Sequence, residues 1–219
     1  GGMLFHSIIC VLLLLQYVNA SDSIDQGRDI RLAFGSCNHV HKMGLWDIVS
    51  SYDPDKLILL GDNMYADRKI GHFIFDEATP EQLKSSYDSL HNDTSFSNMI
   101  QQIGGMENVY ATYDDHDYGI NDGDSAYQYK KESMALFKEF FESGEKAHSG
   151  YDGVNVHRRY KHEDGVYSSS IIRVPLSSID GAASTSMESQ SRSDYLVVKV
   201  IMLDVRYNKV KASRTESCA

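Results

Sequence analysis

The chain has 219 residues and a formal net charge of −10, and this length suits one domain with a sizeable core. The acidic balance argues against a general nucleic-acid-binding or anionic-membrane-binding protein, because both need a basic surface. Only Cys37 and Cys218 lie outside an apolar leader. Two cysteines are too few for a disulfide-stabilised secreted scaffold, although these two could pair.

Residues 1–20 have the pattern of a signal peptide. An apolar run from Leu4 to Val18 ends at Ala20 in the small-residue pattern that signal peptidases accept. The run is shorter than the roughly 20 apolar residues of a membrane span. We therefore expect a secreted protein with no stable membrane span, with an uncleaved membrane anchor as the alternative. A glycosylation sequon at Asn92 agrees with a secretory route.

The next segments predict a strand, a helix and a second strand. Residues 30–37 form a short apolar run that ends in small residues. Residues 45–52 place apolar side chains on one helical face, and Pro54 follows the end of this helix. Residues 56–60 are a continuous apolar run, which is typical of a strand buried on both sides.

A capping box predicts the start of the following helix. Thr79 is a good cap, proline occupies the first helical position, and Gln82 can close the box. The pattern further predicts a helix over 96–103, a strand over 108–113 and a long helix over 125–142.

The last third of the chain has a different character. Residues 157–173 alternate enough to predict a hairpin that turns at 163–165. Residues 177–193 are rich in serine and other polar residues, so we expect a loop or disordered insert. Residues 195–205 predict a final strand. Strands that alternate with helices predict an α/β layered fold.

Polar side chains follow four of the expected strands. They are Cys37 and Asn38, then Asp62 and Tyr65, then Asp114–Asp117, and then Asp204 and Arg206. Adjacent strands would bring these side chains to one edge of the sheet, where open α/β folds place their sites. Clustered carboxylate, phenolate and thiolate groups repel each other unless a cation neutralises them. Taken singly, each residue also has a structural explanation, such as a buried cysteine or a helix cap.

The residue types favour a two-metal phosphoesterase site. Thiolate and phenolate suit a transition metal, whereas carboxylate and amide oxygens suit calcium, magnesium or manganese. Two metals about 3.5–4 Å apart are a common device for hydrolysing phosphate esters. In such a site Asp62 could bridge the ions and His116 could protonate the leaving alkoxide. Arg206 could hold a phosphate oxygen.

Four blocks of the sequence resemble the ordered motifs of the alkaline phosphatase D (PhoD-like) family, which belongs to the calcineurin-like, purple-acid-phosphatase-related metallophosphoesterases. The blocks are Phe34–Asn38, Leu60–Tyr65, Thr112–Asp122 and Leu203–Tyr207. The resemblance covers roughly Ile30 to Tyr207 apart from the polar stretch. It implies a PhoD-like domain over residues 21–210, followed by a polar tail over 211–219.

This resemblance implies a β-sandwich flanked by helices that hydrolyses phosphomonoesters or phosphodiesters with iron and calcium ions. It implies Cys37 and Tyr65 as ligands on the iron side and Asp62 as the bridging ligand. Asp115 occupies the place of a metal-ligating asparagine, and His116 matches the histidine near the leaving group. Asn121 is implied as a further ligand or phosphate contact, and Asn38 and Asp117 as substrate contacts.

The chain departs from the family pattern at its C-terminal side. In the family, a second half with further histidine ligands follows Arg206, whereas here a polar tail without histidine follows Tyr207. We therefore expect an incomplete sandwich with an exposed apolar sheet face and a site that binds metal weakly. Two hypotheses result. The first is a secreted metal-dependent phosphoric ester hydrolase. The alternative is a truncated, inactive secreted remnant that acts as a binding or interaction module.

Overall fold

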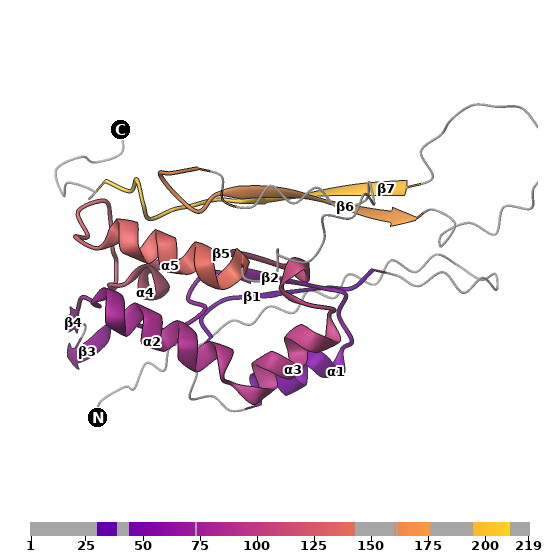
Figure 1. Ribbon diagram of the computed structural model, residues 1–219, viewed down its shortest axis with the longest axis horizontal. Helices are drawn as coiled ribbons and strands as arrows, with labels where there is room; N and C mark the ends of the chain where they lie inside the picture. Colours follow the sequence, from indigo (N-terminus) through magenta and orange to yellow (C-terminus); the bar gives the residue numbers. More distant parts are fainter. Residues whose placement is uncertain are drawn as a thin grey trace, which may run out of the picture.

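The computed structural model describes residues 30–38, 44–72, 74–142, 160, 162–175 and 195–210. Figure 1 shows these segments in colour. The expected signal peptide, polar insert and polar tail lie outside the described residues, as does Cys218.

Two small sheets form successive layers of the fold. The first is parallel, in the order β1-β2-β5, and consists of β1 (Leu32–Gly35), β2 (Lys56–Leu60) and β5 (Val109–Thr112). The second is an antiparallel pair of β6 (Ser168–Pro175) and β7 (Tyr195–Met202). In Figure 1 this pair lies over one face of the parallel sheet, and helices cover the other face. The expected α/β class is thus confirmed.

The helices and the shorter elements complete the layers. The helices α1 (Leu45–Ser51), α2 (Pro80–His91) and α3 (Thr94–Gln102) lie below the parallel sheet in the view of Figure 1. The remaining elements are β3 (Arg68–Gly71), β4 (Ile74–Asp76), η1 (Met106–Asn108), α4 (Asp115–Tyr118) and α5 (Lys130–Glu142). The strands β3 and β4 form an antiparallel hairpin that the sequence analysis did not predict. Among the described residues, no helix is both long and apolar enough to cross a membrane.

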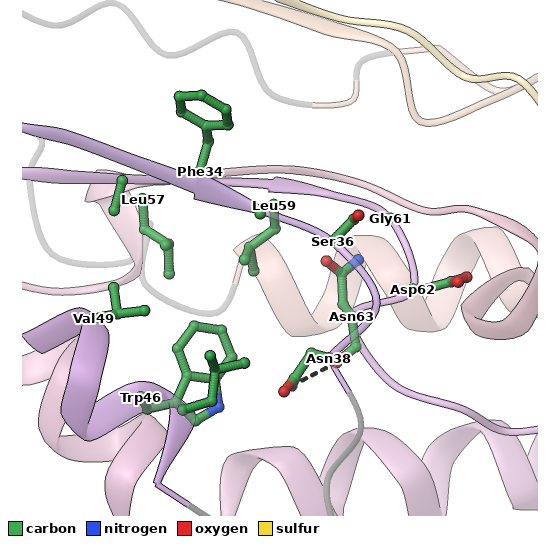
Figure 2. Close-up of a pocket in the computed structure, with 13 residues that line it drawn as sticks. Phe34, Ser36, Asn38, Trp46, Val49, Leu57, Leu59, Gly61, Asp62 and Asn63 are labelled. Atoms are coloured by element: carbon green, nitrogen blue, oxygen red, sulfur yellow. Dashed lines mark hydrogen bonds between the residues drawn. The ribbon is translucent and has the colours of Figure 1, made fainter. Parts of the chain in front are cut away.

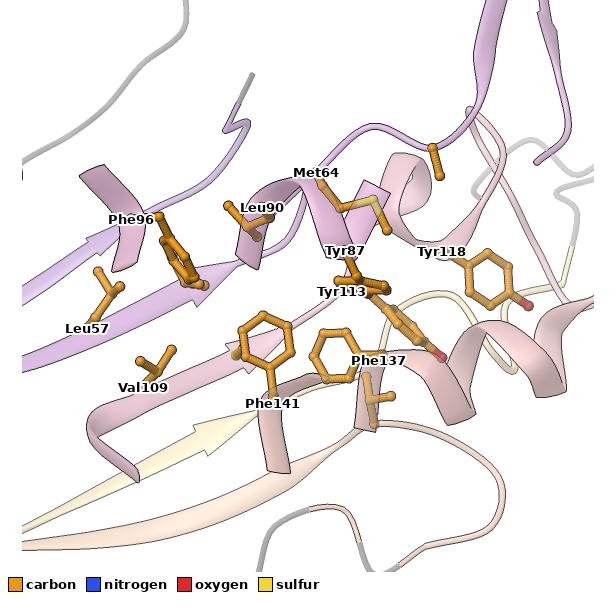
Figure 3. Packing of buried hydrophobic residues seen from close by; sticks show 14 of the residues in the cluster. Leu57, Met64, Tyr87, Leu90, Phe96, Val109, Tyr113, Tyr118, Phe137 and Phe141 are labelled. Atoms are coloured by element: carbon orange, nitrogen blue, oxygen red, sulfur yellow. The ribbon is translucent and has the colours of Figure 1, made fainter. Parts of the chain in front are cut away.

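The main core lies between the parallel sheet and the helices. Leu57 and Leu59 of β2 point into it, as the two-residue period of a strand requires. Its centre is aromatic, and Figure 3 shows Phe137 of α5 beside Tyr113 and Phe141. The ring centroid of Phe137 lies 5.3 Å from that of Tyr113 and 4.7 Å from that of Phe141. All three rings are fully buried, so they supply a large share of the apolar area removed from water.

A smaller core joins the two sheets. Tyr110 of β5, Ile172 of β6 and Met202 of β7 are all buried in it. Ile58 of β2 packs against this cluster, but Leu60 at the end of the same strand is 47% exposed. The expectation that residues 56–60 are buried on both faces is therefore wrong at the last position, because the β6–β7 pair covers only part of the sheet.

The strand at Ser168–Pro175 pairs with a distant strand, which the hairpin expected within residues 157–173 did not anticipate. It pairs with Tyr195–Met202 over eight residues. This longer ladder buries Ile172 and Met202 against Tyr110, which a local hairpin would not achieve. Residues 157–159 and 161 lie outside the described residues.

The long helix begins at Lys130, later than the expected start at Ser125. The backbone N–H of Ser125 donates to Lys209 O at 2.9 Å, and that of Ala126 donates to the Asp124 carboxylate at 2.8 Å. These bonds hold the segment in turns, so its apolar spacing does not continue the helix.

One face of β7 and of the segment after it exposes apolar side chains to solvent. Val197, Ile201, Leu203 and Val205 are between 53% and 64% exposed. They alternate along the chain, so they share the face that points away from the small core. We call them the apolar row. An exposed apolar sheet face was expected from the sequence.

The helix α2 provides a test of the capping assignment. Thr79 Oγ1 accepts the backbone N–H of Gln82, and the Gln82 side chain accepts the backbone N–H of Thr79 at 2.8 Å. We expect Thr79→Ala to lower the free energy of unfolding by about 1 kcal/mol, because a helix-terminal N–H loses its acceptor. Urea unfolding measures the change. Ser85→Ala, at an exposed position of the same helix, is the control and should change stability by less than about 0.5 kcal/mol. Equal losses in the two variants would contradict the assignment.

Candidate metal centre

The carboxyl ends of the three parallel strands meet at one edge of the sheet, as expected. Beyond β1 and β2 the backbone pairing continues, since Cys37 N–H donates to Gly61 O at 3.2 Å and Asn38 N–H donates to Asp62 O at 2.7 Å. Cys37 and Asp62 have left-handed backbone conformations, with φ of 60° and 51°. Such conformations are uncommon for residues with side chains and often mark functional positions.

Gly61 lets the end of β5 approach the end of β2. Its φ is 105°, and a Cβ atom built on it would lie 2.6 Å from Asp114 Cβ and 2.7 Å from Asp114 N. Only glycine fits such a close approach at this backbone conformation. The segments after β2 and β5 are therefore close enough for their side chains to share one site.

The carboxylate of Asp62 faces two different groups of donors. Its Oδ2 accepts the Cys37 thiol at 3.5 Å and the Tyr65 hydroxyl at 3.3 Å. Its Oδ1 accepts the backbone N–H of His116 at 3.3 Å. Burial raises the pKa values of both the Cys37 thiol and the Tyr65 hydroxyl, and the charge of Asp62 raises them further. The protein alone thus keeps these two groups protonated, and a cation would favour their anionic forms.

Asp62, Asp115 and His116 form a cluster of the kind that binds metal ions. One possible ligand atom from each residue lies within 4.8 Å of the others. Asp62 and Asp115 are buried. Burial raises the pKa of Asp62, and the charges of Asp115 and Asp114 raise it further, against the opposing effect of His116. A buried carboxylate whose charge is disfavoured by a neighbouring carboxylate is a donor that fits a cation, because the cation removes the repulsion.

His116 is oriented by Asp67. Its Nδ1 lies 2.7 Å and 2.9 Å from the two carboxylate oxygens of Asp67, whose side chain is 1% exposed. Tyr65 and Phe75 flank the imidazole ring, with centroids 4.3 Å and 5.3 Å away. Burial lowers the pKa of His116, but Asp67 and the other nearby carboxylates outweigh it and hold that pKa above its ordinary value. The Asp67 contact occupies Nδ1, so Nε2 is the ring nitrogen left for a ligand or proton transfer.

The sequence analysis missed Asp67. It lies two residues after the Leu60–Tyr65 block, and its acidic side chain was the available signal. Its relation to His116, which is 49 residues away along the chain, depends on the packing of the β2 and β5 ends.

Asp117 is a structural anchor for the edge of the sheet. Its carboxylate is fully buried and accepts the backbone N–H groups of Asp62 at 3.3 Å, Asn63 at 2.9 Å and Asp114 at 2.6 Å. The side-chain amide of Asn63 donates to it as well. Burial raises the pKa of Asp117, whereas these N–H donors oppose that rise by stabilising the ionised form. The expected substrate contact at Asp117 does not fit this position, because protein groups surround the carboxylate completely.

Arg206 is engaged by carboxylates of the site. Its guanidinium contacts Asp114 Oδ1 at 2.5 Å and Asp115 Oδ1 at 3.5 Å, and it donates to Gly123 O at 3.2 Å. Asp204 holds the backbone here, since its Oδ1 accepts the Arg206 N–H at 2.8 Å. Arg206 therefore pairs mainly with Asp114 and lies farther from Asp115 in this structure, rather than presenting its guanidinium to a phosphate as the sequence analysis expected.

The remaining candidates lie around this cluster. Asn38 is buried and its amide donates to Asn63 O at 3.0 Å. The Asn121 amide donates to Asp122 at 3.0 Å, while the Asn121 backbone N–H donates to Asp67 at 2.8 Å. The backbone of Asn121 thus helps to hold the Asp67 carboxylate in place. Asn92 is exposed at the end of α2, and its side chain is open to modification.

Comparison of the chain with protein-family models, with curated proteins and with solved structures found no match.

The anchor role of Asp117 predicts a large loss of stability in Asp117→Ala. We expect the free energy of unfolding to fall by about 3 kcal/mol or more, because several buried N–H groups lose their acceptor and each costs about 1–3 kcal/mol. Urea unfolding followed by circular dichroism gives this value. Asp88→Ala is the control, since Asp88 is exposed and pairs with Lys84 at 3.0 Å on the surface of α2. That variant should lose less than about 1 kcal/mol. Similar losses in both variants would contradict the anchor role.

Proposed function

We propose that this chain is a secreted metal-dependent phosphoric ester hydrolase, related to the PhoD-like metallophosphoesterases that its motifs resemble. The observation that carries the proposal is the convergence of Asp62, Asp115 and His116, with Cys37 and Tyr65 on the second oxygen of Asp62. Its substrates would be small phosphomonoesters or phosphodiesters. The parallel sheet and the β6–β7 pair would then be parts of the two sheets of a metallophosphoesterase sandwich.

Cys37, Tyr65, Asp62 and Asp115 are the residues that would hold the metal ions. Cys37 and Tyr65 reach Asp62 Oδ2 and would hold the first ion, which their sulfur and phenolate oxygen suggest is iron. Asp115 belongs to the same cluster as Asp62 and would hold a second, harder ion such as calcium. Bound cations would supply Lewis-acid activation of water and neutralise the charge on the phosphoryl oxygens.

The residues of the chain would carry the proton transfer and the positioning. His116 would donate a proton from Nε2 to the leaving alkoxide oxygen. Asp67 holds the imidazole at Nδ1 and favours the protonated ring, while Tyr65 and Phe75 restrict its rotation. Arg206 would act indirectly, because its guanidinium pairs with Asp114 at 2.5 Å and lies 3.5 Å from Asp115, beside the cluster.

One observation supports a second candidate function, a secreted interaction module without catalysis. The apolar row places four exposed apolar side chains on and after β7, with Lys199 between Val197 and Ile201, and exposed apolar side chains on one sheet face are a feature of interaction surfaces. This candidate predicts that the purified chain binds no metal and hydrolyses no phosphate ester.

The metal proposal is tested on the purified chain by metal analysis and by assay of p-nitrophenyl phosphate and bis(p-nitrophenyl) phosphate. We expect bound iron and calcium, and hydrolysis that a chelator abolishes. Asp62→Asn should lower turnover by roughly 100-fold or more, because it removes the shared ligand charge. Asp88→Asn, on the exposed face of α2, is the matched control and should keep full activity. A wild-type chain that contains no metal and shows no turnover would refute the enzyme proposal.

The role of His116 and Asp67 is tested by the choice of leaving group. We expect Asp67→Asn to lower kcat by roughly 10–100-fold with little change in metal content, because His116 loses its orienting partner. The loss should be larger for phenyl phosphate than for p-nitrophenyl phosphate, since the poorer leaving group needs the proton more.

The control for this variant is Asp76→Asn, because Asp76 lies in the adjacent hairpin and pairs with Arg68 at 2.7 Å at the surface. Equal losses for the two substrates in Asp67→Asn would show that Asp67 does not act through proton transfer.

A further inference from the structure

The β3–β4 hairpin turns one of its two faces toward His116. Arg68 and Asp76 lie opposite each other in the two strands, and their side chains form an ion pair at 2.7 Å on one face. Lys69 and Phe75 lie opposite each other at the next position, so their side chains share the other face. The ring centroid of Phe75 lies 5.3 Å from that of His116. The face that carries Lys69 and Phe75 is therefore the face next to the candidate metal centre.

Phe75 lies on the solvent side of the His116 ring. The other aromatic neighbour of His116 is Tyr65, whose hydroxyl donates to Asp62, so Tyr65 lies on the side of the carboxylate cluster. Phe75, by contrast, belongs to a hairpin whose other side chains are mostly exposed. It is itself partly buried, because its ring packs against His116.

The alcohol half of a substrate would meet this face of the hairpin. In Figure 2 the Asp62 carboxylate points away from Trp46 of α1 and from Leu59 of β2. Figure 1 places the hairpin and α4 at the end of the fold opposite α1. In the proposed hydrolase, His116 Nε2 protonates the oxygen of the leaving alcohol. The carbon body attached to that oxygen then lies beside the groups on the solvent side of the imidazole ring.

Lys69 supplies positive charge next to Phe75. It is exposed, and no acid in the described part of the chain forms an ion pair with it. Residues directly opposite in an antiparallel pair have Cβ atoms about 4.5–5.5 Å apart, and the lysine stem is long and flexible. The ammonium group can therefore reach a molecule that lies on the Phe75 ring. Arg206 is already paired with Asp114, so Lys69 is the cation available to an anionic group there.

We propose that Phe75 and Lys69 form the subsite for the alcohol half of the substrate, and that they select phosphate esters of aromatic alcohols with an acidic substituent. The aromatic body contacts Phe75, and the acidic group pairs with Lys69. This inference rests on the proposed hydrolase function, because that function places the alcohol beside His116. An aromatic contact and an exposed ion pair each add modest affinity, so the subsite sets a preference among substrates.

The charge preference is tested with two phosphonates that cannot be hydrolysed, 4-carboxybenzylphosphonate and 4-(aminomethyl)benzylphosphonate. Calorimetry on the metal-loaded chain gives the two dissociation constants. We expect Lys69→Glu to shift their ratio by roughly tenfold in favour of the amine, because attraction and repulsion change places. Arg68→Glu is the matched control, since it makes the same charge change at the adjacent position on the other face. At about 0.15 M salt it should shift the ratio by less than about twofold.

The aromatic contact is tested with benzylphosphonate and methylphosphonate. We expect the wild-type chain to bind benzylphosphonate roughly tenfold more tightly, and Phe75→Ala to remove most of this difference, because the ring loses its apolar partner. Ile74→Ala is the control, since Ile74 is 58% exposed and follows the alternation of the strand onto the other face. An undiminished difference in Phe75→Ala would refute the contact.

Hydrolysis of phenyl phosphate separates this inference from the proposed function. A chain that hydrolyses phenyl phosphate, but whose ratio of phosphonate constants shifts equally in Lys69→Glu and Arg68→Glu or in neither, would refute the subsite and leave the hydrolase proposal standing. A chain that holds no metal and hydrolyses no phosphate ester would refute the hydrolase proposal, and the subsite with it.

Discussion

The buried carboxylate of Asp117 is the contact on which the edge of the parallel sheet depends. It accepts backbone N–H groups from the segment after β2 and from the segment after β5. The backbone pairing of β2 with β5 ends at Leu60 and Thr112. Beyond these residues, the hydrogen bonds of Asp117 to both segments hold them at a fixed separation. Asp62 and Asp115 belong to these two segments, so their meeting is a consequence of this one buried group.

Charge in the cluster is balanced by partners from distant parts of the chain. Arg206 follows β7 and lies beside Asp114 and Asp115, while Asp67 follows β2 and lies beside His116. Each pair removes part of the electrostatic cost of burial, because it places opposite charges together in a region of low polarity. The remaining imbalance falls on Asp62, whose charge is disfavoured by the carboxylates of Asp114 and Asp115. No arginine among the described residues pairs with Asp62.

Local signals in the sequence predicted much of the fold and the three residues of the cluster, but not the partner of His116. Thr79 and Gln82 form the capping box as expected, and the apolar run before Gly61 is a central strand. The convergence of Asp62, Asp115 and His116 also followed from strand order, because parallel neighbours end at one edge. The partner of His116 and the pairing of β6 with β7 depend on contacts between distant segments, and apolar spacing carries no information about these contacts.

Gly61 contributes no side chain, yet it sets a limit on how the sequence can vary. Any other residue would place its Cβ against Asp114 and push the two strand ends apart. Every acidic and imidazole group would remain in such a variant, but the groups would no longer face one another. A search for functional positions that considers only reactive side chains would overlook Gly61, although a mutational scan should find it as intolerant as Asp62.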